Sequence, residues 1–222
     1  MTAQLTPDPF VSAMALIPAY AGALLGLSCL ARAGRAGGRA AVPWWLAGAA
    51  CVSLANWAPH LADDLLSPGL RLDPAGAAFS ALAGLPWVAV GAWVMNSHPG
   101  SRRGLLGGVV AGAGALAVHT SGLAAVRLPT VFDLAPGALA LGAAVAVLGT
   151  LEALRLTLGP ARPAVTPPGP RAGARRAGPG LGTAAGVLAA TALLAHFLVL
   201  AAATVRTAPP GGVQPVAVEM VR

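Results

Sequence analysis

Residues 105–133 read LLGGVVAGAGALAVHTSGLAAVRLPTVFD. Glycine, alanine and branched aliphatic residues fill most of this stretch, and its one histidine is His119. About 20 apolar residues cross a bilayer as a helix, so the pattern predicts a membrane-spanning helix over 104–126. An ionisable side chain inside such a helix is energetically costly, which makes His119 a candidate functional residue.

The composition of the whole chain indicates an integral membrane protein. Of its 222 residues 56% are hydrophobic and only 9% are charged, with a mean hydropathy of +0.74, whereas a soluble domain carries about a quarter charged residues. The sequence predicts an all-α fold with six transmembrane helices. These helices are expected at 9–30, 43–62, 74–97, 104–126, 134–156 and 181–205.

The positions of charged residues predict the orientation of the chain. The net charge of +7 comes from arginine alone, because the chain has no lysine. Arginines gather in every second link, where they favour the cytoplasmic side and not a nucleic-acid partner. We therefore expect a multi-pass protein of the inner (cytoplasmic) membrane with both termini outside. The Pro-, Gly- and Arg-rich residues 157–180 predict a flexible cytoplasmic linker, and 207–222 a short tail.

The six segments form three helix pairs, at about 8–62, 73–126 and 133–205 within a single membrane domain at 8–206. The first helix of each pair is expected to begin near an aspartate and a proline, because aspartate is a good N-cap and proline fits the first turn. The aspartates are Asp8, Asp73 and Asp133. The second helix of each pair carries one histidine near its outer end: His60, His119 and His196.

Small residues place these histidines on faces that pack inside the bundle. Gly108, Gly112, Ala115, His119 and Gly122 fall 4, 3, 4 and 3 residues apart, which puts them on one face of a helix. Three imidazoles at similar depth could converge, and imidazole is a good ligand for copper and zinc. The predicted metal-site residues are His60, His119, His196, Asp63 and Asp64, with either aspartate placed to orient His60.

The quoted stretch resembles the MHYT domain, a bacterial membrane sensor module. The resemblance lies in the glycine-rich run from Gly107-Gly108, in Val118-His119-Thr120-Ser121-Gly122-Leu123 and in the Arg127-Leu128-Pro129 loop. Asn56-Trp57-Ala58-Pro59-His60-Leu61 and Ala195-His196-Phe197 are similar to the motifs of the other two pairs. The resemblance extends over about 8–206 and implies six helices in three pairs.

The resemblance also implies a function, with a clear departure from the family pattern. MHYT domains are proposed to bind copper through Met, His and Tyr and to sense small gases. Here Pro59, Val118 and Ala195 replace the methionine before each histidine, and only the histidines are kept. The sequence therefore predicts a sensor that binds copper or zinc through histidines and signals through a separate protein partner.

Two alternatives to the sensor remain open. The chain could be a non-catalytic membrane helper that assists assembly through helix contacts and binds no metal. It could also be a small-solute transporter, since Pro18, Pro59 and Pro86 could interrupt helices near the middle of the membrane. An enzyme is not expected, because no Ser-His-Asp grouping, phosphate loop or dinucleotide fingerprint is present.

Overall fold

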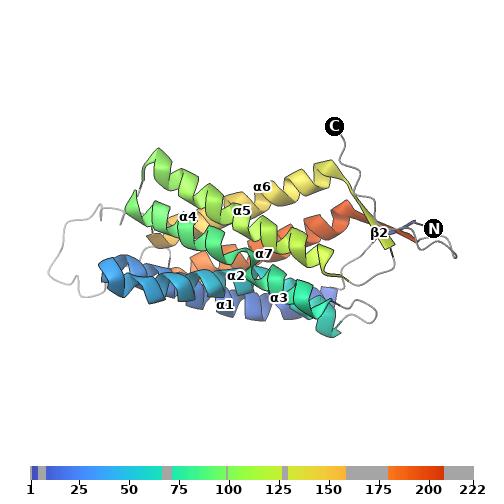
Figure 1. The fold of residues 1–222 in the computed structure, drawn as a ribbon, viewed down its shortest axis with the longest axis horizontal. Coiled ribbons are helices and arrows are strands. Elements are labelled where there is room, and N and C mark those ends of the chain that lie inside the picture. The colour runs from blue at the N-terminus through green and yellow to red at the C-terminus, as the bar shows by residue number, and fades with distance from the viewer. Residues whose placement is uncertain are drawn as a thin grey trace.

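The computed structural model describes residues 2–4, 9–66, 72–98, 100–126, 130–158 and 180–207. Long helices lie side by side and form an elongated bundle (Figure 1). The helices are α1 (Pro9–Ala36), α2 (Val42–Leu66), α3 (Pro74–Ala83), α4 (Leu85–Ser97), α5 (Arg102–Ala124), α6 (Pro136–Leu158) and α7 (Leu181–Ala202). Nearly all of the predicted linker and tail, at 159–179 and 208–222, lies outside the described residues.

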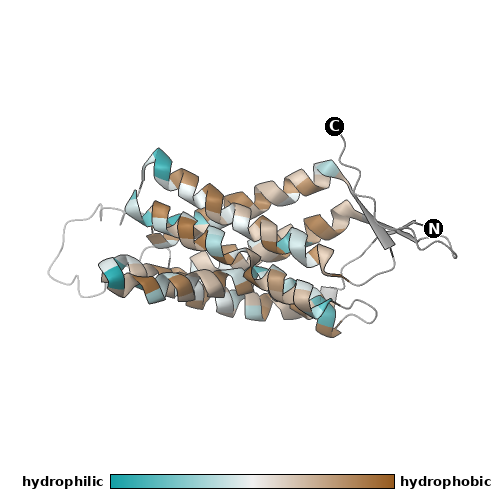
Figure 2. Cartoon of the chain, viewed as in Figure 1, coloured by the Kyte–Doolittle hydropathy of each residue, from teal (hydrophilic) through white to brown (hydrophobic). Residues whose placement is uncertain are grey.

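Among the described residues, five segments are long and apolar enough to cross a membrane, against the six that were predicted, and they support a helical membrane protein. They are Phe10–Ala36, Pro74–Ser97, Arg102–Ala124, Pro136–Leu158 and Leu181–Ala202. Large apolar side chains such as Ile17, Phe79 and Leu148 point outward, as contact with lipid requires. The most hydrophilic residues lie mainly near the helix ends (Figure 2). The five helices indicate a multi-pass membrane protein.

The third predicted helix is divided at Gly84 into α3 and α4. Pro86 lacks a backbone N–H and cannot donate to the preceding turn. At the same break, the Ser53 hydroxyl donates to the Ala81 carbonyl at 2.7 Å, so a side chain from α2 supports the interruption. A Cβ on residue 84 would lie 2.9 Å from the Ser53 Oγ and from Val118. Glycine therefore lets α2 and α5 approach this break.

One end of the bundle carries a small antiparallel sheet that the sequence did not predict. Its strands are β1 (Thr2–Gln4), β2 (Thr130–Leu134) and β3 (Ala203–Thr207), in the order β1-β3-β2. Asp133 lies within β2 and does not begin a helix, which corrects the predicted helix start at 134. Asp73 does cap α3, because its carboxylate accepts from the Gly76 N–H at 2.9 Å.

Charged residues separate between the two ends of the bundle. The C-terminal part of α1, the α1–α2 turn and the start of α5 lie at one end. They hold exposed Arg32, Arg35, Arg39, Arg102 and Arg103. The Arg32 guanidinium lies 4.4 Å above the Trp44 ring, a favourable cation–π contact. The opposite end holds Asp63, Asp64 and Asp73.

Glycines allow several helix pairs to pack backbone against backbone. Gly91 of α4 and Gly107 of α5 face each other, and a Cβ on residue 107 would lie 2.6 Å from the Gly91 carbonyl oxygen and 2.8 Å from the Met95 nitrogen. Gly112 similarly faces Val147 of α6. Small residues at helix contacts are how membrane helices gain packing energy without a hydrophobic driving force.

We expect Gly107→Ala to destabilise the protein, because the added methyl group meets backbone atoms that cannot move independently. Overpacking of this kind typically costs about 1–3 kcal/mol. Thermal unfolding of the purified protein in detergent measures the loss. Gly137→Ala is the matched control, since nothing lies within 4 Å of a Cβ there. Equal melting temperatures for the two variants would contradict the close α4–α5 contact.

Candidate functional site

Three helices bring their single histidines to the same depth in the bundle. His60 lies on α2, His119 on α5 and His196 on α7. Each is five or six residues from the C-terminal end of its helix, or about 8–9 Å along the helix axis. These three helices also pack against one another. The predicted convergence of the histidines is therefore present in the structure.

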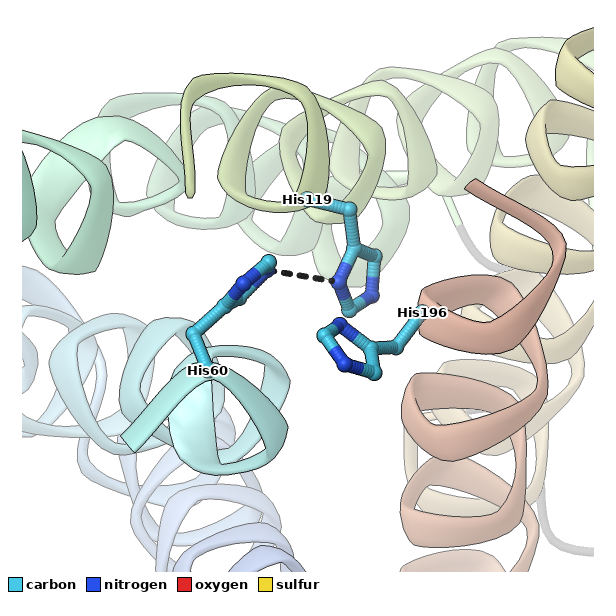
Figure 3. Close-up of side chains that lie close together, drawn as sticks. All are labelled: His60, His119 and His196. Carbon is cyan, nitrogen blue, oxygen red and sulfur yellow. Dashed lines mark hydrogen bonds between the residues drawn. The ribbon is translucent and has the colours of Figure 1, made fainter. Parts of the chain in front are cut away.

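The three imidazoles are in mutual contact. The His60 and His196 ring centroids are 4.5 Å apart, those of His60 and His119 5.5 Å, and those of His119 and His196 5.9 Å. One nitrogen from each ring can be chosen so that all three lie within 4.8 Å of one another. Figure 3 shows the rings entering a common space from three different helices.

Burial of the cluster leaves some ring nitrogens without a hydrogen bond. His60, His119 and His196 are 4%, 0% and 2% exposed. His119 Nδ1 and His60 Nε2 are 3.4 Å apart and share one hydrogen bond, whose direction depends on the tautomers. Within the part of the chain that the structure describes, His119 Nε2 and His196 Nδ1 have no partner. An unmatched buried polar atom typically costs about 1–3 kcal/mol.

The two aspartates have different roles. Asp63 Oδ2 lies 2.8 Å from His196 Nε2, so this carboxylate contacts His196 rather than His60, which we expected it to orient. Asp64 Oδ1 accepts from the Leu72 N–H at 2.8 Å and supports the chain before α3. The possible metal ligands that converge are the three histidines, and neither aspartate is among them. The structure thus places Asp63 beside the cluster and Asp64 in a loop contact.

A small pocket of about 20 Å³ opens on the aspartate side of the histidines. This volume is enough for about one water molecule or a small ion. The pocket is lined by His60, Asp63, Asp64, Leu72, Leu123, Val126 and Leu200. The pairing of Leu72 with Val126, which forms part of this lining, joins residues far apart in the sequence and was not predicted.

The donor set fits a metal ion that accepts nitrogen ligands. Two nitrogens bound to one tetrahedral zinc at about 2.0–2.1 Å lie about 3.4 Å apart, and His119 Nδ1 and His60 Nε2 are separated by that distance. The overall spread of 4.8 Å is larger, so binding would require the rings to move closer together. His60, His119 and His196 would be the ligands, each through one ring nitrogen.

Gly122 shapes the site in a way that its sequence position did not reveal. A Cβ on residue 122 would lie 2.6 Å from both Cε1 and Nε2 of His60. Gly122 was predicted on the inward face of its helix but not as the residue that accommodates the His60 ring. Only the partner helix explains this role, so no local signal in the sequence could have indicated it.

Comparisons with protein-family models, with curated proteins and with solved structures found no match.

We expect Gly122→Ala to displace the His60 imidazole and to break its contact with His119. NMR of the purified protein with ¹⁵N-labelled histidine should show changed ring signals for both residues. Gly186→Ala is the matched control, because the nearest atom to a Cβ there is a Tyr20 ring carbon at 4.0 Å. Unchanged histidine signals in Gly122→Ala would contradict the arrangement of the cluster.

Proposed function

We propose that this chain is a multi-pass membrane sensor that binds one copper or zinc ion through His60, His119 and His196. The observation that carries the proposal is the convergence of three buried imidazole nitrogens within 4.8 Å. Imidazole is a preferred ligand for both metals, and the Irving–Williams order favours Cu²⁺ over Zn²⁺ at a site of this kind.

The unmatched nitrogens favour a ligand role over simple helix packing. A hydrogen bond between membrane helices contributes only about 0.6 kcal/mol, and the cluster contains a single bond between its rings. His119 Nε2 and His196 Nδ1 are buried without partners among the described residues. A site held only for stability has no reason to keep these two nitrogens unmatched.

The resemblance to MHYT domains supports the same proposal. In this view the chain has six spans in three helix pairs, each pair contributing one histidine. The arginine-rich end faces the cytoplasm and the histidine cluster lies near the outer leaflet of the inner membrane. In the same view, the pocket lined by His60, Asp63 and Asp64 is the route by which an ion from outside reaches the cluster.

The proposed signal is a change in helix packing. The ligand nitrogens spread over up to 4.8 Å, which is wider than one bound ion allows. Binding of the three histidines to one ion would therefore pull α2, α5 and α7 together. Closely packed helices pass such a movement along their length. A separate membrane or cytoplasmic protein in contact with these helices would receive the signal.

We expect the purified wild-type protein to bind about one equivalent of Zn²⁺ or Cu²⁺ and to melt at a higher temperature when bound. His60→Ala, His119→Ala and His196→Ala should each weaken binding at least tenfold, because each removes one ligand. Isothermal titration calorimetry and metal analysis measure the affinity and the stoichiometry. His98→Ala is the matched control, since His98 follows the last residue of α4 and its ring contacts the Val94 carbonyl.

Two results would contradict the proposal. The first is a wild-type protein whose melting temperature is the same with and without either metal. The second is metal binding that His98→Ala and His119→Ala weaken equally. Full biological activity in a triple histidine-to-alanine variant would favour the helper that acts by helix contact.

A further inference from the structure

We propose that Asp63 is a positioning residue that fixes the tautomer of His196 and directs the lone pair of His196 Nδ1 into the histidine cluster. This inference rests on the proposed metal site and specifies how one of its ligands is prepared. The observation behind it is the 2.8 Å contact between Asp63 Oδ2 and His196 Nε2.

The two nitrogens of a neutral imidazole have opposite roles. One carries a hydrogen and donates, and the other has a lone pair and accepts or binds a metal. An ionised carboxylate only accepts hydrogen bonds, so the contact with Asp63 requires the hydrogen on His196 Nε2. The lone pair is then on Nδ1, the nitrogen that is buried without a partner among the described residues.

The surroundings of Asp63 and His196 keep this arrangement in place. His196 is 2% exposed, whereas the Asp63 side chain is 18% exposed. The imidazole is therefore confined, and the carboxylate borders the pocket. Asp63 comes from α2 and His196 from α7, so the contact also joins two of the three helices that carry the cluster. Carboxylate partners of this kind orient metal-binding histidines in many proteins.

The adjacent aspartate provides a comparison within the same helix turn. Asp64 accepts from the Leu72 backbone N–H and also lines the pocket. It has the same charge as Asp63 and a similar distance from the helix end. A difference between the two aspartates therefore reports orientation of His196 and not the general negative charge of the pocket.

The test uses the full-length protein in detergent, with ¹⁵N-labelled histidine and His196→Gln to assign the signals. Without metal, we expect the wild type to show His196 with a protonated Nε2 and an unprotonated Nδ1. Asp63→Asn should mix the two tautomers, because an amide can donate as well as accept. Asp63→Asn should also weaken Zn²⁺ or Cu²⁺ binding about 10–100-fold, while Asp64→Asn should weaken it less and leave the His196 tautomer unchanged, because the Asp64 carboxylate accepts from the Leu72 N–H. Asp63→Glu should recover part of the loss.

Each other result identifies which idea fails. If wild-type His196 carries its hydrogen on Nδ1, or if the two Asn variants bind metal equally well, the positioning role is wrong and the three-histidine site can still stand. If the tautomers behave as expected but the wild type binds neither ion, the metal site is wrong, and with it the ligand role of His196 Nδ1. Circular dichroism of Asp63→Asn and Asp64→Asn checks that both variants are folded.

Discussion

Close contact between helices through glycine and alanine is the constraint on which the rest of the structure depends. Lipid offers apolar side chains as good an environment as a neighbouring helix does, so the helices associate through tight packing. Gly91 against Gly107 and Gly112 against Val147 bring α5 close to α4 and α6. The same rule applies at the histidines, where the missing side chain of Gly122 gives the His60 ring its space. Larger residues at these positions would separate the helices, and the three imidazoles would then be too far apart to act on one ligand.

The histidine cluster is therefore a polar group of residues held together by apolar packing. Its internal bond, between His119 and His60, contributes little in a membrane. Two of its nitrogens add a cost because they have no partner among the described residues. Tight packing elsewhere in the bundle must offset this cost. Local arrangements that lower stability and persist within a well-packed structure are commonly functional, which is the physical basis for treating these histidines as a ligand site.

Sequence patterns predicted the helical class, the positions of most helices and the meeting of His60, His119 and His196, because these depend on hydropathy, helical period and helix direction. Pro18, Pro59 and Pro86 were all possible interruptions, and only the helix with Pro86 is divided. The sequence could not select this one, since the break at Gly84 depends on contacts that α2 and α5 make with α3 and α4. The strand that contains Asp133 depends on pairing with residues about 70 positions away. The partner of Asp63 was assigned to the wrong histidine because spacing along α2 favours His60, whereas the observed contact crosses to α7. Local periodicity gives the faces of helices, and only tertiary packing gives the partners on those faces.

The contact between Asp63 and His196 would couple α2 to α7 in the proposed response to a bound ion. Because Asp63 belongs to α2 and His196 to α7, a movement of the His196 ring toward the other imidazoles must either carry the carboxylate with it or lengthen a 2.8 Å hydrogen bond. The first result draws α2 toward α7 at the depth of the cluster. The second leaves the buried His196 N–H without a hydrogen-bond partner, which is unfavourable. The ion proposed to bind the rings would therefore favour the closer arrangement of α2 and α7, and the carboxylate proposed to orient His196 would also transmit the movement between these helices.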